Sequence, residues 1–298
     1  MPDARSLAVQ SVLYLSAPLD IVRAGLALAN SVSWAREDGL ISDWSLQLGD
    51  CSPAPVMDDA SLAEIRAAVE LAGGTLQYTA FGENLGSAAG HNALAALTST
   101  ELMLILNPDA QVAPDTIGVL ARRVVDRVGI AEARQVPLEH PKDFARYDGD
   151  TSWASTACAL TARAAFDTVG GFDSETFFLY CDDVDYSWRL RLAGYRVVYE
   201  PAAAVFHDKR LTITGDWPAS SAEVYYSAEA AILLAYKYSR PDLVRSITAR
   251  YTKQGTEPLL KAVGEYNSRR ASGRLPEQLD SGHSVAEFVK DNYAVHRF

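Results

Sequence analysis

Acidic side chains follow the ends of two predicted strands in this sequence of 298 residues. Asp109 comes just after the apolar run at 102–106 and the pair Asn107-Pro108, and Asp50 ends an earlier predicted strand. In open α/β sheets, ligands bind just beyond the carboxyl ends of the strands. The Asp109 carboxylate there suits a hard divalent cation, which can in turn hold phosphate oxygens. The Asp50 carboxylate could accept a hydrogen bond from a base N–H or a ribose hydroxyl. The alternative for both residues is an ordinary turn-forming aspartate.

A second group of carboxylates, Asp182, Asp183 and Asp185, opens a predicted helix, where the helix dipole favours negative charge. Asp185 and Arg189 are four residues apart, so we expect them to form an ion pair on one helix face. That pairing leaves Asp182 or Asp183 to face a cleft. Aromatic residues on both sides of the cluster would raise the proton affinity of such a carboxylate and suit it to general-base catalysis. Simple capping by a solvated acidic turn is the alternative.

A single histidine, His207, closes a predicted extended segment and could reach the same sheet edge as Asp109. One carboxylate and one imidazole form an incomplete ligand set, which diphosphate oxygens and water would have to complete, as for Mg²⁺ or Mn²⁺. A structural histidine is the alternative. Small residues at 86–90, preceded by Asn84, predict a helix N-terminus that could closely approach phosphates.

The elements that must position these residues alternate regularly in the first half of the chain. Strands are predicted at residues 9–15, 44–48, 75–81 and 102–106, and helices at 19–35, 62–71, 87–97 and 114–128. Ser61 is predicted to cap the helix at 62–71, with Glu64 completing a capping box. This alternation indicates a parallel sheet with crossover helices.

The second half of the chain is less regular. Strands are predicted at 128–133, 151–160, 195–199 and 204–207, and helices at 161–169, 182–192 and 223–238. The polar stretch 134–150 is predicted to be a long loop, a type of segment that is often functional. We expect a domain boundary near Pro218, with polar helical segments from there to the C-terminus.

The composition, 48% apolar and 22% charged residues, is typical of a globular protein. A formal net charge of −11 argues against a broad nucleic-acid surface. Cys51, Cys158 and Cys181 are far apart, so we expect neither a disulfide framework nor structural zinc, and a cytoplasmic location is the default. No segment is typical of a signal peptide or a transmembrane helix, so any membrane contact would be peripheral.

Taken together, these motifs resemble those of family 2 glycosyltransferases of the GT-A fold, in particular the bacterial rhamnosyltransferase-like branch. The resemblance covers about residues 9–210 and rests on five stretches in order: 49–52, 84–92, 107–109, 170–194 and 204–207. It implies a Rossmann-like α/β domain with a mostly parallel central sheet flanked by helices over residues 1–218. Residues 219–298 would then form a C-terminal helical appendage.

The resemblance also implies roles for individual residues. Asp50 resembles the carboxylate that reads the nucleotide base. Asp109 and His207 resemble the ligands of Mg²⁺ or Mn²⁺ that hold the donor diphosphate. Asp183, beside Asp182, resembles the catalytic base of an inverting sugar transfer.

Other donor and acceptor contacts follow from the same resemblance. The expected donor-binding set also includes Ser52, Asn84, Gly86, Asn92 and Asn107. Trp153, Trp188 and the loop 134–150, which begins with Arg134, are candidates for sugar stacking and acceptor contact, although either tryptophan could instead be a core residue. At position 91, where relatives often carry arginine, this sequence has histidine, so we assign no phosphate contact there.

The expected function is transfer of a sugar from a nucleoside diphosphate sugar, such as dTDP-rhamnose or a UDP-sugar, to a saccharide or lipid-linked saccharide. The process would be bacterial surface polysaccharide synthesis, in the cytoplasm or at the inner face of the plasma membrane. Nucleic acid is not an expected partner, and peripheral membrane contact and a homodimer stay open. A nucleotidyltransferase is the alternative enzyme, but residues 14–20 lack its glycine-rich basic loop. An inactive sugar-binding relative is disfavoured by the intact set Asp109, Asp183 and His207.

Overall fold

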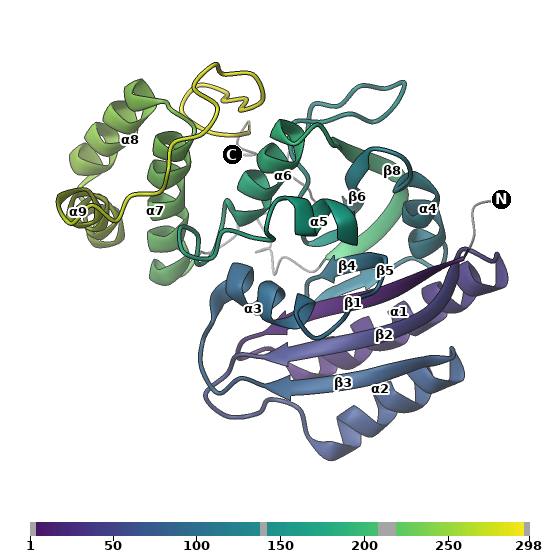
Figure 1. Ribbon diagram of the computed structural model, residues 1–298. Helices are drawn as coiled ribbons and strands as arrows, with labels where there is room; N and C mark the ends of the chain where they lie inside the picture. Colours follow the sequence, from purple (N-terminus) through teal and green to yellow (C-terminus); the bar gives the residue numbers. More distant parts are fainter. Residues whose placement is uncertain (1–3, 138–141, 208–218, 295–298) are drawn as a thin grey trace.

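The computed structural model describes residues 4–137, 142–207 and 219–294, which form a central eight-stranded sheet with helices on both faces (Figure 1). The strand order is β3-β2-β1-β4-β7-β6-β8-β5. In chain order the strands are β1 (Arg5–Leu13), β2 (Ile41–Asp50), β3 (Gly74–Ala80), β4 (Leu102–Leu106), β5 (Ala110–Val112), β6 (Val128–Val136), β7 (Cys158–Ala162) and β8 (Arg196–His207). The helices are α1 (Pro18–Glu37), α2 (Asp59–Leu71), α3 (Gly86–Ala95), α4 (Thr116–Arg123), α5 (Arg163–Thr168), α6 (Asp182–Leu192), α7 (Ser221–Lys237), α8 (Pro241–Gln254) and α9 (Glu257–Ala271).

The first half of the sheet is parallel, as the strand–helix alternation predicts. β1 pairs in parallel with both β2 and β4, and β2 with β3. The second half is mixed, because β7 runs antiparallel to both β4 and β6, and β5 runs antiparallel to β8. The chain therefore has a mixed α/β sheet in which the carboxyl ends of β1, β2 and β4 point to one edge.

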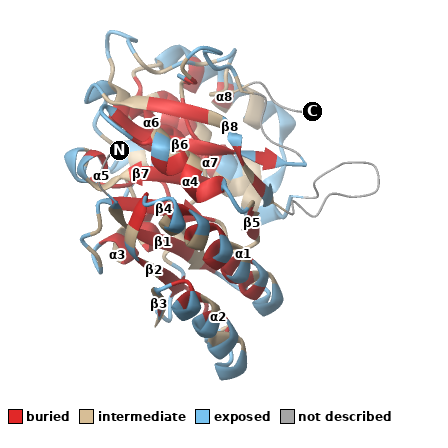
Figure 2. Cartoon of the chain, turned by 90° about the vertical axis from the view of Figure 1, so that its right-hand side faces the viewer, coloured by how far each residue is buried: buried red, intermediate tan, exposed pale blue. Residues whose placement is uncertain are grey.

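Strand β4 lies in the middle of the sheet and is buried on both faces, as its uninterrupted apolar sequence predicts. Leu102, Leu104 and Leu106 pack into one hydrophobic cluster with residues of α1, α2 and α4. Met103 and Ile105 face the opposite cluster, which includes residues of α3, α5 and α6. Figure 2 shows the resulting buried layer along the sheet. Such a strand gives a rigid support to the residues that follow it.

Several predicted boundaries are wrong for local reasons. Asp58, not Ser61, is the N-cap of α2, because its carboxylate accepts a hydrogen bond from the Ser61 backbone N–H at 2.7 Å. The segments 195–199 and 204–207 are one strand, β8, whose pairing register with β6 shifts around Pro201. Of the strand predicted at 151–160, only residues 158–160 lie in a strand, β7, which continues to Ala162. The short strand β5 was not predicted.

The C-terminal helices α7, α8 and α9 pack together and against α6. Their hydrophobic cluster combines Phe177, Val184 and Trp188 with Leu233 of α7 and with Tyr238, which follows that helix. Residues from both sides of the expected boundary thus share one core, while Pro218 itself lies outside the described residues. Beyond Ala271, the described residues 272–294 form no further helix, contrary to the prediction. None of the helices in the described parts is long and apolar enough to cross a membrane.

Candidate active site

The turn after β4 brings Asp109 to the end of β8. The Ala110 backbone N–H donates to the Asn107 carbonyl at 3.1 Å, and β5 then pairs antiparallel with β8 so that Ala110 faces His207. This register places Nε2 of His207 3.3 Å from Oδ1 of Asp109. The sequence therefore predicted correctly that these two side chains reach the same sheet edge.

Further polar groups surround the His207 ring. Its Nδ1 lies 3.1 Å from Oε1 of Gln135, a buried residue of β6, and Nδ2 of Asn107 lies 3.4 Å from its Nε2. Among the described residues, no group of three or more His, Cys, Asp or Glu side chains could hold a metal ion. One carboxylate oxygen and one imidazole nitrogen nonetheless fit Mg²⁺ or Mn²⁺ when diphosphate oxygens and water complete the shell.

The acidic cluster sits at the start of α6, after two residues in an unusual backbone conformation. Tyr180 and Cys181 both have positive φ values, +68° and +57°. Left-handed conformations of non-glycine residues cost free energy and are concentrated at functional sites. Here they turn the chain sharply, so that Asp182 and Asp183 line the same cavity as Asp109 and His207.

Asp182 and Asp183 are held in surroundings that disfavour their charge. Asp182 is only 5% exposed, and its Oδ2 has no hydrogen-bond partner within the described parts of the chain. Burial raises the pKa of Asp182. Burial, and then the neighbouring charge of Asp182, raise the pKa of Asp183, whose Oδ1 accepts from the Val184 N–H at 2.8 Å. A carboxylate with a raised pKa at a cavity wall is suited to accept a proton.

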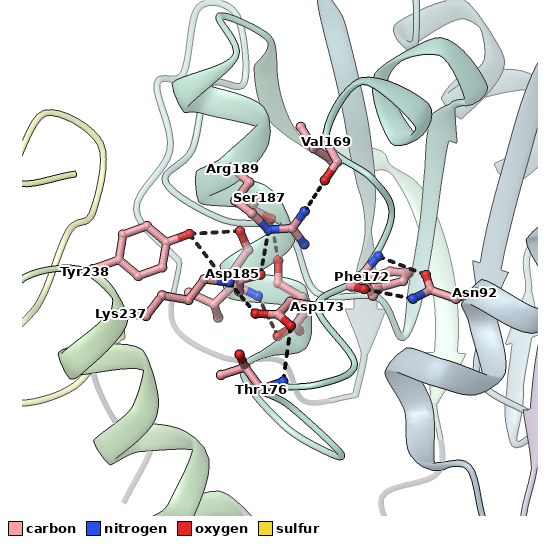
Figure 3. Close-up of polar contacts among 12 residues, drawn as sticks. Asn92, Val169, Phe172, Asp173, Thr176, Asp185, Ser187, Arg189, Lys237 and Tyr238 are labelled. Atoms are coloured by element: carbon pink, nitrogen blue, oxygen red, sulfur yellow. Dashed lines mark hydrogen bonds and ion pairs between the residues drawn. The ribbon is translucent and has the colours of Figure 1, made fainter. Parts of the chain in front are cut away.

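Asp185 has a different role, as its predicted pairing with Arg189 indicates. The Arg189 Nε lies 2.7 Å from Oδ2 of Asp185, which confirms that ion pair. Nζ of Lys237 also lies 2.6 Å from Asp185 Oδ1, and the Tyr238 hydroxyl donates to the same atom at 3.1 Å (Figure 3). Asp185 is therefore fixed within the protein, and only its two neighbours in the cluster face the cavity.

Two adjoining cavities lie at this sheet edge. The first, about 460 Å³, contains the four groups Asp109, His207, Asp182 and Asp183. The second, about 550 Å³, lies toward the ends of β1 and β4 and the start of α3. Four residues line both cavities: Ser87, Asn107, Leu179 and Glu223. The two cavities therefore form one continuous site.

Asn84, Gly86 and Asn107, three of the predicted donor-binding residues, line the second cavity. Gly86 has a φ of +73°, and a Cβ atom there would lie 2.3 Å from the Phe178 carbonyl oxygen. Only glycine fits this close approach. The small residue thus allows the start of α3 to pack against the loop that carries the acidic cluster.

Asp50, which was expected to read the nucleotide base, is engaged by its own loop in this structure. Asp50 is 0% exposed and lines neither cavity. Its carboxylate accepts hydrogen bonds from the Ser52 and Val56 backbone N–H groups and from the Tyr78 hydroxyl. Burial alone would raise its pKa, but these hydrogen bonds together lower it. Asp50 is an ionised anchor for the loop after β2, and the sequence could not reveal that this loop covers it.

Ser52 and Asn92 are likewise engaged inside the protein. The buried Ser52 hydroxyl accepts a hydrogen bond from the Leu15 N–H at 2.8 Å. The Asn92 amide donates to the Phe172 carbonyl at 2.8 Å and accepts from the Phe172 N–H at 2.9 Å (Figure 3). Both residues hold loops together, and neither lines a cavity of the site.

Of the three residues expected to contact the acceptor, only Trp153 lines the first cavity. Trp188 is 0% exposed, packs edge-on against Tyr238 and donates to the Ser152 hydroxyl at 3.0 Å, so it is a core residue. Arg134 is exposed but does not line the site, because the following residue Gln135 faces inward from β6.

Two residues, Lys142 and Tyr293, pack against the Trp153 ring. Lys142 forms a buried ion pair with Glu132, and its Nζ lies 3.7 Å from the centroid of the Trp153 ring. Tyr293, near the end of the described chain, packs edge-on against Trp153 with ring centroids 5.1 Å apart and lines the first cavity. Gln135 and Lys142 lie in the stretch 134–150, which was expected to contact the acceptor, but neither was named individually. Tyr293 was missed, because no local motif marks a residue that reaches the site only through tertiary packing.

Comparisons with known proteins agree with this geometry. No protein-family model matches the sequence. The N-acetylglucosaminyl-diphospho-decaprenol L-rhamnosyltransferase of Mycobacterium tuberculosis is 44% identical over 133 residues, which are 44% of this chain and 40% of the relative. The match thus spans less than half of that relative's length.

Two solved structures show the same fold at low sequence identity. The mannosyltransferase PcManGT from Pyrobaculum calidifontis, in complex with GDP-Man and Mn²⁺, matches with a TM-score of 0.55 and 16% sequence identity. The match covers 92% of this chain and 86% of the mannosyltransferase chain. GalNAc-T7, with UDP, GalNAc and Mn²⁺, has a TM-score of 0.62 and 11% identity, covering 92% of this chain and 56% of its own. The chain therefore has the GT-A fold, and it is similar to family 2 glycosyltransferases of the rhamnosyltransferase type.

Proposed function

We propose that this chain transfers a sugar from a nucleoside diphosphate sugar to a hydroxyl group of a glycan or lipid-linked glycan. The observation that carries the proposal is the convergence of Asp109, His207, Asp182 and Asp183 on one cavity at the carboxyl ends of the strands. Ligands of open α/β sheets bind at this edge. The similarity to a rhamnosyltransferase favours a nucleotide-linked rhamnose as the donor sugar, with a UDP-sugar as the alternative.

The donor would occupy both cavities. Asp109 and His207 would hold Mg²⁺ or Mn²⁺, and that cation would supply positive charge to the diphosphate. Asn84 and Gly86 at the start of α3 line the adjoining cavity, where a helix N-terminus favours phosphate groups. In place of the buried Asp50, we assign the nucleoside to the space beside Tyr14, an exposed aromatic residue that lines this cavity.

Asp183 would act as the general base. The acceptor oxygen forms a bond to the anomeric carbon while the bond from that carbon to the diphosphate oxygen breaks. The hydroxyl proton passes to Asp183, and the nucleoside diphosphate leaves with the electron pair. Attack on the face opposite the leaving group inverts the anomeric centre. Among the described residues, none donates a hydrogen bond to Oδ2 of Asp183, which leaves that oxygen available to the acceptor.

The acceptor would lie against Trp153 and Tyr293, on the side of the first cavity away from the donor. A lipid-linked acceptor is consistent with the Mycobacterium tuberculosis relative, whose name specifies a diphospho-decaprenol substrate. Such an acceptor would bring this chain to the inner face of the plasma membrane during surface polysaccharide synthesis.

Isothermal titration calorimetry of dTDP, UDP and GDP binding in the presence of Mn²⁺ tests the donor assignment. We expect at least one nucleotide to bind, and Asp109→Asn to weaken its metal-supported binding without lowering the melting temperature. Asp115→Asn is a matched control, because Asp115 is an exposed residue outside both cavities. Unchanged affinity in Asp109→Asn would refute the metal site.

The products of turnover test the reaction class. With a panel of nucleotide sugars, we expect release of a nucleoside diphosphate and of sugar transferred to acceptor or to water. A nucleotidyltransferase would instead produce a nucleoside triphosphate from a nucleotide sugar and pyrophosphate. Formation of the triphosphate would favour that alternative enzyme.

A further inference from the structure

Gln135 is a buried polar residue that lines the first cavity beside His207. It lies on β6, which pairs with β8 so that Gln135 is opposite Val205, two residues before His207. Its side chain is buried, with the residue 4% exposed. The amide Nε2 donates to the Ser155 hydroxyl oxygen at 3.2 Å, which directs Oε1 toward His207.

This orientation favours one of the two tautomers of the neutral His207 ring. With the amide in this orientation, Oε1 of Gln135 is an acceptor and matches the tautomer in which the ring nitrogen 3.1 Å away, Nδ1, donates. In the neutral ring, Nε2 then has a free lone pair. Nδ2 of Asn107, 3.4 Å from Nε2, is a donor and agrees with the same assignment.

The other ring nitrogen, Nε2, lies near an acceptor that competes for the same proton. Oδ1 of Asp109 lies 3.3 Å from Nε2 of His207. If the proton moved to Nε2, the ring would donate to a carboxylate, and hydrogen bonds to charged acceptors are stronger than those to neutral ones. That tautomer would block the lone pair needed to bind a metal ion. With the proton on Nδ1, two acceptors face each other across 3.3 Å, an arrangement that a cation would stabilise.

We propose that Gln135 is a positioning residue that keeps the proton of His207 on Nδ1, so that Nε2 is free to bind the divalent cation beside Asp109. Metal-bound histidines generally donate their other ring nitrogen to an acceptor that fixes the ring in this way. The part of this inference that concerns metal binding rests on the proposed function. The part that concerns the tautomer does not, because it refers to the metal-free protein.

The tautomer is measured directly by two-bond ¹H–¹⁵N correlation spectra of the metal-free protein labelled at histidine. In alkaline solution, we expect the neutral His207 ring to carry its proton on Nδ1. In Gln135→Met, which keeps the size of the side chain but removes the acceptor, we expect the proton to move to Nε2. A wild-type spectrum with the proton on Nε2, or an unchanged spectrum in Gln135→Met, would overturn the proposal.

Gln135→Glu separates positioning from packing. A carboxylate also accepts from Nδ1, so this variant should keep the wild-type tautomer, with the Ser155 hydroxyl donating to the carboxylate where it accepts from the amide in wild type. If Gln135→Glu does not fold, the wild type and Gln135→Met still decide the question. A matched control exists elsewhere on the sheet: Oε1 of the buried Gln10 lies 3.4 Å from Nδ1 of His91. Gln10→Met should alter the signals of His91 and leave those of His207 unchanged.

The second measurement is the affinity for Mn²⁺, which electron paramagnetic resonance of the free ion determines. Loss of an outer-shell partner typically weakens metal binding about 10- to 100-fold, so we expect a loss of that size in Gln135→Met and a smaller loss in Gln135→Glu. Equal affinity of Gln135→Met and wild type would overturn the role in metal binding. A wild-type protein that binds no Mn²⁺ would instead refute the proposed metal site, and the spectra would still decide the role of Gln135.

Discussion

Nζ of Lys237 lies 2.6 Å from Oδ1 of Asp185, and this ion pair joins the C-terminal helix α7 to the helix that carries Asp182 and Asp183 (Figure 3). The same ammonium group lies 2.6 Å from Oδ2 of Asp173. The Lys237 side chain is 6% exposed, so the charges attract each other with little screening by water. The C-terminal region is therefore coupled to the acidic cluster by charge as well as by its hydrophobic core.

Replacing Lys237 with Met should strongly destabilise the protein. The substitution leaves Arg189 and the Tyr238 hydroxyl as the partners of the buried Asp185 carboxylate. It also takes the cation away from Asp173, whose pKa is lowered because hydrogen bonds and the Lys237 charge outweigh the effect of burial. Removing one partner of a buried ion pair typically costs about 3–5 kcal/mol. Urea unfolding would measure the loss.

The control for that variant is Lys253→Met. Lys253 lies on α8, is exposed, and has no ion pair in the described parts of the chain. Exposed substitutions of this kind usually change the free energy of unfolding by less than about 0.5 kcal/mol. Similar effects of the two substitutions would show that the buried ion pair adds nothing to stability.

The elements that carry the chemistry could be predicted because their signals are local. The uninterrupted apolar run at β4 and the acidic start and glycine-terminated end of α6 gave correct bounds for both. The start of α2 was wrong by a few residues because two neighbouring side chains could cap it. Strand β5 was missed because three residues carry too little periodicity, and its pairing with β8 is a tertiary contact.

The sequence could predict a site residue only where its place at the end of a strand is enough to bring it to the site. Asp109 and His207 each follow or end a strand at the same sheet edge, and the topology brings them together. Asp50 also ends a strand at that edge, but the loop after β2 folds over its carboxylate. Whether a strand-end aspartate faces a ligand or its own loop depends on packing, which the sequence pattern does not encode. The same holds for Tyr293, which approaches the site from the far end of the chain.

The motif predicts that replacing Asp50 alters nucleotide preference, whereas its buried environment predicts a loss of stability with nucleotide preference unchanged. Asp50→Asn keeps the shape but replaces one acceptor oxygen by a donor that faces the Ser52 or Val56 N–H group. An unsatisfied buried polar group typically costs about 1–3 kcal/mol, so we expect a loss of stability of that size. Below its melting temperature, the variant should bind dTDP and UDP with the same relative affinity as wild type. An altered ratio in calorimetry would restore the base-reading role.

Tyr293 should affect the acceptor and not the donor. Its ring packs against Trp153 in the first cavity, while the second cavity, proposed for the nucleotide, lacks it. Tyr293→Ala should therefore raise the KM for the acceptor and leave the KM for donor hydrolysis unchanged. Tyr147→Ala is the matched control, because Tyr147 is fully exposed and lines neither cavity. A change confined to the donor KM would contradict the placement of the acceptor.

The role of Asp183 predicts both a rate and a pH profile. General-base catalysis is typically worth about 10²- to 10⁴-fold, so Asp183→Asn should lower kcat by that factor with nucleotide affinity little changed. Burial and the charge of Asp182 raise the pKa of Asp183. Because the base must be ionised, the kcat of wild type should fall as the pH drops through a value above the ordinary aspartate pKa of about 3.9. Residual turnover of Asp183→Asn should lack this acid limb.

The same raised pKa predicts that Asp183→Asn is more stable than wild type at neutral pH. A carboxyl group whose pKa is raised on folding stabilises the fold below its unfolded pKa and loses that contribution as the pH rises through its folded pKa. The amide carries no charge to bury, so the melting temperature of Asp183→Asn should exceed that of wild type at pH 7, and the difference should shrink toward pH 4. A residue that merely capped α6 would show the reverse, a loss of stability with nearly normal turnover. Near-normal kcat in Asp183→Asn, together with a large loss in Asp182→Asn, would transfer the role of base to Asp182.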